Sequence, residues 1–260
     1  MIVGRNYAFG SFYNNQETSY TDINYETATY KGIGFKSCLL LGITFLVTLF
    51  MIGWVLTMRR LPVAIYVISF ITTIVLQLIV IFKPTKAKTL SIPYAAAEGL
   101  ILGCLCGLLE VALPGEGLTI AGSALSITLA IFLGALILYS TGIIKVSGKF
   151  LGFFIILIMG VGIFIVSLSI LSLIFRLSSG ISLIGLFYNS DLAMILCVIM
   201  CIVASFYVIM SLNEADNFVQ GGYDKSYEWY AAFAILINVI YLFLEVLRLL
   251  LIIAARNKRD

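Results

Sequence analysis

Long apolar runs separated by short polar connections dominate the chain. Each run is long enough for a tilted helix to cross a bilayer. Because backbone groups in lipid must be satisfied within the segment, we expect helices rather than strands. The pattern therefore predicts an all-α integral membrane protein, a seven-transmembrane helix bundle. The runs cover residues 37–58, 61–82, 90–113, 118–140, 150–175, 192–213 and 229–255.

The last run, 229–255, carries the most informative polar residues. Asn238, Tyr241, Glu245 and Arg248 follow one another at spacings of three, four and three. At 3.6 residues per turn, these spacings place them on one stripe of a helix. A carboxylate and a guanidinium at membrane depth are costly when they face lipid. We therefore expect the stripe to face protein, either as a lined pathway or gate or as a structural ion pair that orients the helix.

Small residues recur every four positions in the third run, at Ala95, Gly99, Gly103 and Gly107. Such a ridge lets a neighbouring helix approach closely. Glu98 lies beside the ridge, about 12 Å into the span at 1.5 Å per residue. A carboxylate at this depth is a functional candidate by default. The alternative is a protonated side chain that is hydrogen-bonded to a neighbouring helix.

Further carboxylates lie near the ends of two runs. Glu214 and Asp216 end the sixth run, and Glu110 lies near the far end of the third, where we expect it to be solvated. Two carboxylates as close as Glu214 and Asp216 titrate together if they are desolvated, and the alternative is a solvated helix end. If Glu98, Glu214 and Asp216 converge with Glu245, they would form an oxygen-rich path for transient Ca²⁺ binding, with shared protons as the gate.

Composition narrows the class of protein. Of the 260 residues, 62% are hydrophobic and 11% are charged, which is far below the charged fraction of a soluble domain. The net charge of +3 gives no case for nucleic acid, and the absence of histidine removes histidine-dependent metal sites and catalysis. We expect no enzyme activity and five free cysteines within the apolar runs. Residues 1–34 are polar and are expected as a tail, before a helical domain at 35–260.

Several stretches in order resemble the Bax inhibitor-1 family, in particular its bacterial Bax inhibitor-1-like branch. The resemblance extends over nearly the whole chain from about residue 29, and it depends on the order and spacing of the stretches rather than on a single motif. The stretches are TYKGIGFKS (29–37), AAAEGLILG (95–103), LYSTGIIKVSGKF (138–150), NEADNFVQGG (213–222) and YEWYAAFAILINVIYLFLEVLRLL (227–250).

The resemblance implies six spans around a central final helix and a pH-sensitive Ca²⁺ leak. In that family a carboxylate of the sixth span pairs with one of the seventh to sense protons. By motif, the first position falls on Glu214 or Asp216, and the second falls on Asn238, which cannot titrate. Either Glu245 takes this role, with Arg248 holding it ionised, or the chain is gated differently or is not gated by pH.

The resemblance also sets the expected partners and location. It implies a multi-pass protein of the bacterial plasma membrane that contacts lipid, Ca²⁺ and protons and has no cofactor other than Ca²⁺ as the permeant ion. Some bacterial relatives are described as modulators of membrane proteases. A non-conducting regulator that binds other membrane proteins is therefore the alternative function.

Overall fold

A computed structural model describes residues 26–58, 62–140, 152, 156 and 191–257. Six helices in this part of the chain are long and apolar enough to cross a membrane, and they correspond to six of the seven predicted runs. The predicted fifth run, 150–175, lies almost entirely outside the described residues. The elements are α2 (Tyr30–Met58), α3 (Val63–Phe82), the short 3₁₀ helix η1 (Pro84–Lys86), α4 (Ala87–Ala112), α5 (Gly117–Ser140), α8 (Asp191–Gln220) and α9 (Tyr227–Asn257).

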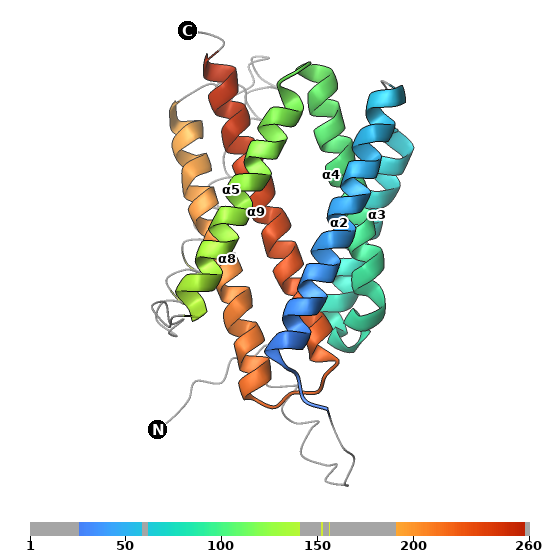
Figure 1. Cartoon of the computed structure of the whole chain (residues 1–260), viewed down its shortest axis with the longest axis vertical. Helices are drawn as coiled ribbons and strands as arrows, with labels where there is room; N and C mark the ends of the chain where they lie inside the picture. Colours follow the sequence, from blue (N-terminus) through green and yellow to red (C-terminus); the bar gives the residue numbers. More distant parts are fainter. Residues whose placement is uncertain (1–25, 59–61, 141–151, 153–155, 157–190, 258–260) are drawn as a thin grey trace, which may run out of the picture.

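The last helix, α9, lies between two groups of helices. It packs against α2 and α4 on one side and against α5 and α8 on the other, whereas α3 packs mainly on α4 (Figure 1). The expected central position of the final helix therefore agrees with the described part of the bundle.

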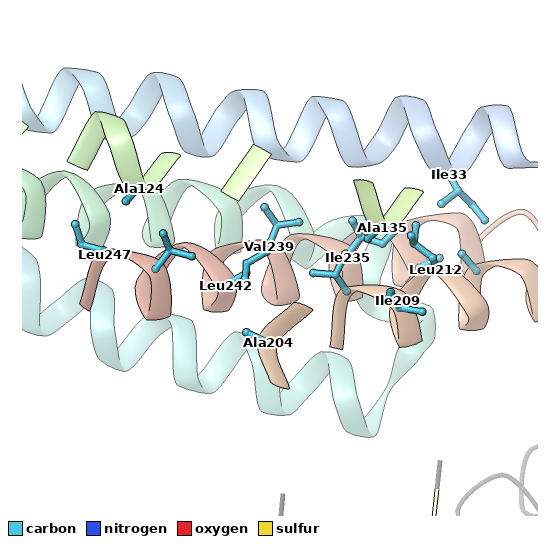
Figure 2. Packing of buried hydrophobic residues seen from close by; sticks show 14 of the residues in the cluster. Ile33, Ala124, Ala135, Ala204, Ile209, Leu212, Ile235, Val239, Leu242 and Leu247 are labelled. Carbon is cyan, nitrogen blue, oxygen red and sulfur yellow. The ribbon is translucent and has the colours of Figure 1, made fainter. Parts of the chain in front are cut away.

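Apolar side chains from the facing helices form the main core around α9. Figure 2 shows Ile235, Val239 and Leu242 of α9 beside Ala204 and Ile209 of α8. Most of α3 remains exposed, with only Ser69, Thr73 and Val80 buried, as expected for a helix at the edge of a bundle in lipid.

The predicted small-residue ridge of α4 packs against α2, and this prediction is confirmed. A Cβ added at Gly99 or Gly103 would overlap side chains of α2 or its backbone. Because the backbones are so close, the Thr44 hydroxyl donates to the carbonyl oxygen of Ala95 at 3.1 Å, and the Thr48 hydroxyl donates to that of Gly99 at 3.2 Å. Interhelical bonds of this kind add to the packing that holds membrane helices together.

The connection between α4 and α5 is a tight turn closed by one carboxylate. Gly115 has a φ of +82°, which glycine adopts without steric penalty. Glu110 accepts hydrogen bonds from the backbone N–H groups of Gly115 and Leu118, both at 2.7 Å. The carboxylate is exposed, as predicted. It supplies acceptors for backbone N–H groups in the connecting turn and at the start of α5, which would otherwise lack a partner.

Candidate functional site

The polar stripe of α9 faces α8, in agreement with the expectation that it faces protein. The side-chain amide of Asn238 donates to the backbone carbonyl oxygen of Tyr207 at 3.2 Å. One turn further along, the ring of Tyr241 meets the ring of Tyr207 edge-to-face, with centroids 5.9 Å apart. The stripe therefore forms a polar seam between the two helices.

Glu245 is the most unusual member of this seam. The residue is 8% exposed, and its Oε2 atom is buried without a hydrogen-bond partner in the described part of the chain. Among the described residues, the cation paired with it is Arg248, whose Nη1 atom lies 3.9 Å from Oε2, which is too far for a hydrogen bond. The thiols of Cys197 and Cys201 on α8 are close enough to interact electrostatically with the carboxyl group. Glu245 thus occupies a site where a proton or a cation would satisfy the carboxyl group.

Glu98 is linked through Tyr94 to the other side of α9, nearer its amino end. It is half-buried on α4 and accepts a hydrogen bond from the phenol of Tyr94 at 2.8 Å. The ring of Tyr94 packs edge-on against Phe233 of α9, with centroids 4.7 Å apart. Phe233 and Glu245 are separated by twelve positions on one helix, about 18 Å at 1.5 Å per residue. Glu98 and Glu245 therefore lie at different levels along α9.

Glu214 and Asp216 separate onto different faces of α8. Glu214 is half-buried and interacts electrostatically with Tyr230 of α9. Asp216 accepts hydrogen bonds from the phenol of Tyr30 on α2 and from the side chain of Gln220. Of the two carboxylates, Glu214 is therefore the one beside the central helix.

Neither carboxylate lies opposite Asn238. The contacts of α9 with α8 place Asn238 at the level of Tyr207 and Tyr230 at the level of Glu214. Glu214 is seven positions beyond Tyr207 on α8, which is about 10 Å at 1.5 Å per residue. The positions implied by the family resemblance therefore lie at different levels of the α8–α9 contact.

The described residues contain no group of three or more His, Cys, Asp or Glu side chains that could hold a metal ion. A fixed multidentate site formed by Glu98, Glu214 and Asp216 is therefore not present in this part of the chain. Transient contact of Ca²⁺ with single carboxylates is a different expectation, and it remains a prediction.

Sequence reasoning missed one buried carboxylate, Glu228, at the start of α9. It is 1% exposed and forms an ion pair with Lys36 of α2. Lys36 is 192 positions away, so no helical spacing connects the two residues. Glu228 lies among the aromatic residues Tyr227, Trp229 and Tyr230, a pattern typical of the membrane interface, where a carboxylate is expected to be solvated.

The connection between α8 and α9 carries two further charges with identifiable partners. Hydrogen bonds from the hydroxyl and the amide of Ser226 hold the pKa of Asp224 below its ordinary value. The hydrogen bond and the charge of Glu26 raise the pKa of Lys225. Both groups therefore remain charged near neutral pH, and neither is a candidate for proton sensing.

The comparisons with known proteins give one match. The family model described as Bax inhibitor 1 like covers residues 7–255, nearly the whole chain. No curated protein and no solved structure matches the chain.

Proposed function

The chain belongs to the Bax inhibitor 1 like family, and from that premise we propose that it is a proton-controlled leak for Ca²⁺ or similar cations. It is a multi-pass membrane protein with α9 between the other described helices. The bacterial plasma membrane is the location that the proposal assigns to it.

The buried, unsatisfied carboxyl oxygen of Glu245 is the observation that carries the proposal. Tyr241 hydrogen-bonds to the carboxyl group, but Oε2 has no donor in the described part of the chain. An ionised carboxylate with one oxygen left without a donor is costly to bury, so such a group tends to take up a proton or a cation. The Arg248 guanidinium is close enough to favour the charged form but too far to satisfy it by a hydrogen bond. In a membrane protein this combination is more typical of ion or proton pathways than of packing.

The carboxylates at other levels of α9 extend the same chemistry. Glu98 is hydrogen-bonded to Tyr94, whose ring packs on α9, and Glu214 lies near Tyr230 of α9. Both carboxylates are half-buried. A hard cation prefers carboxylate oxygens as ligands and could move from one to the next without a fixed cage. When the carboxyl groups are protonated they attract no cation, so acidification closes the path in this proposal.

A single substitution tests the role of Glu245. Glu245→Gln keeps the shape of the side chain but cannot ionise, so the pH dependence of Ca²⁺ flux into liposomes should become flatter than that of the wild type. The matched control is Glu116→Gln, which changes an exposed carboxylate in the α4–α5 connection and should leave the profile unchanged. If Glu245→Gln and wild type have the same profile, Glu245 is not the proton sensor.

A non-conducting regulator is the second candidate. The exposed apolar side chains of α3 include Val63, Ile68 and Phe82, and such a face suits lipid or the helix of another membrane protein. This reading predicts no Ca²⁺ flux by the purified protein, and it leaves the buried oxygen of Glu245 unexplained.

A further inference from the structure

The segment just before α2 is attached to the connection that precedes α9. Thr27 and Asp224 form an isolated antiparallel bridge, and the N–H of Ala28 donates to the carbonyl oxygen of Tyr223 at 2.8 Å. The N–H of Lys225 donates to the carbonyl oxygen of Glu26 at 2.9 Å. In Figure 1 the dark blue start of the described chain lies beside the orange-red connection between α8 and α9. These contacts hold together two regions that are far apart in the sequence. Thr29 and Glu228, for example, are separated by 199 positions.

A buried ion pair reinforces this attachment. The Oε1 atom of Glu228 accepts from the N–H of Thr29 at 2.8 Å and from its hydroxyl at 2.9 Å, and Oε2 pairs with the Lys36 ammonium. The Lys36 ammonium also lies 5.2 Å from the centre of the Trp229 ring, within range of a cation–π interaction. Both oxygens of the Glu228 carboxylate are satisfied, whereas Oε2 of Glu245 has no hydrogen-bond partner among the described residues.

The carboxylate is enclosed as well as paired. A Cβ added at Gly32, in the first turn of α2, would overlap the carboxyl group of Glu228, whereas one added at Gly34 would meet nothing within 4 Å. The Lys36 side chain is 13% exposed. Removing one partner of a buried ion pair leaves an uncompensated charge and is strongly destabilising. The interaction therefore depends on both charges and on a glycine at position 32.

We propose that Thr29, Gly32, Lys36 and Glu228 form a latch that fixes the amino end of α9 against α2, with Glu228 as a positioning residue for the leak path. The argument for a role in the leak rests on the function proposed above. The latch acts at the end of α9 where Glu214 and Glu98 lie, so it sets the spacing between α9 and the helices that carry these carboxylates. Its release would let the end of α9 separate from α2 and would raise the basal leak.

The variants come in matched pairs. Lys36→Met and Glu228→Gln each remove one charge, and Lys36→Arg keeps the charge as the conservative variant. Gly32→Ala disturbs the carboxyl group without changing any charge, and Gly34→Ala is its control on the same helix. Glu26→Gln removes the neighbouring exposed ion pair with Lys225, in which Glu26 is 73% exposed, and controls for loss of a surface charge.

The first readout is backbone hydrogen exchange of the protein in lipid nanodiscs. Exchange in residues 26–32 and in the first turns of α9 should be about tenfold faster or more in Lys36→Met, Glu228→Gln and Gly32→Ala. Gly34→Ala, Glu26→Gln and Lys36→Arg should remain close to the wild type. Wild-type exchange rates in Glu228→Gln, or equal acceleration in Gly32→Ala and Gly34→Ala, would overturn the latch.

The second readout is Ca²⁺ flux in liposomes over a range of pH, which a merely structural role would not alter. Lys36→Met, Glu228→Gln and Gly32→Ala should raise the basal leak several-fold and change its pH profile. Lys36→Arg, which keeps the charge, should have the wild-type profile. If the wild type leaks and the variants change exchange but not flux, the positioning role is wrong. If the wild type does not leak at all, the proposed function fails, and the latch is still judged by exchange at the start of α9.

Discussion

At the scale of single residues, position 238 separates this chain from the expectation set by its family resemblance. Asn238 donates to a backbone carbonyl oxygen of α8, and Glu214 lies about two turns away from the level of Tyr207 rather than opposite Asn238. The neutral amide suits its partner, because a carbonyl oxygen requires a donor. The seam at this level is therefore held in a way that does not depend on pH.

Replacing this amide by a carboxyl group should make the contact pH-dependent. In Asn238→Asp, the protonated carboxyl group can donate to the Tyr207 carbonyl oxygen, but the ionised form has no proton and is repelled by it. The α8–α9 contact should therefore hold at low pH and weaken as the pH rises, and Ca²⁺ flux should depend more steeply on pH than in the wild type. The measurement is flux in liposomes at stepped pH.

Asn238→Ala is the matched control for this substitution. It removes the hydrogen bond at every pH, at a cost of about 1 kcal/mol, and adds no titrating group. An Asn238→Asp profile that matches that of Asn238→Ala would show that the seam at this position does not control the path.

The sequence predicts the stripe of α9 well but not its partners. The spacing of Asn238, Tyr241 and Glu245 follows from helical geometry, so their common face could be predicted. Which atoms they contact depends on the register of α8 against α9. The spacing of polar residues within one helix carries no information about that register. The pairing of Lys36 with Glu228 was missed for the same reason, since it depends on how distant helices meet.

At the scale of helices, the sequence predicts the small-residue ridge of α4 but not the helix that packs on it. The spacing of four identifies a face that allows close approach, and the structure adds that α2 is the helix that uses it. Helix bounds were predicted less well. The first helix begins at Tyr30 rather than at residue 37, and this end is held by hydrogen bonds from Thr29 to Glu228 and from Tyr30 to Asp216.

Substitutions at two glycines should have different effects on the stability of the protein. A methyl group at Gly103 overlaps Met51 and the Thr48 carbonyl oxygen, so Gly103→Ala should destabilise the protein by about 1–3 kcal/mol through overpacking. Gly134 on α5 has open space around a Cβ, so Gly134→Ala should be neutral or should stabilise by up to about 1 kcal/mol. Unfolding midpoints in one detergent compare the two variants, and an equal loss in both would contradict the ridge.

At the scale of the whole molecule, the apolar runs predict the class of fold, and the described helices agree with six of them. The position of α9 between two groups of helices agrees with the family resemblance and with the expectation that its polar stripe faces protein. The distribution of carboxylates along α9 could not be predicted, because their levels depend on helix packing. Instead of converging on one site, they lie at successive levels, with Glu228 paired at the amino end and one oxygen of Glu245, Oε2, unsatisfied within the described residues further along.

Ca²⁺ flux through the purified wild-type protein in liposomes, measured between about pH 6 and pH 8, tests the central claim most directly, since a buried carboxyl group can titrate in this range. Protein-free liposomes of the same lipid supply the background. We predict flux above this background that falls as the pH is lowered. Flux equal to the background at every pH would contradict the proposed leak and would favour the non-conducting regulator.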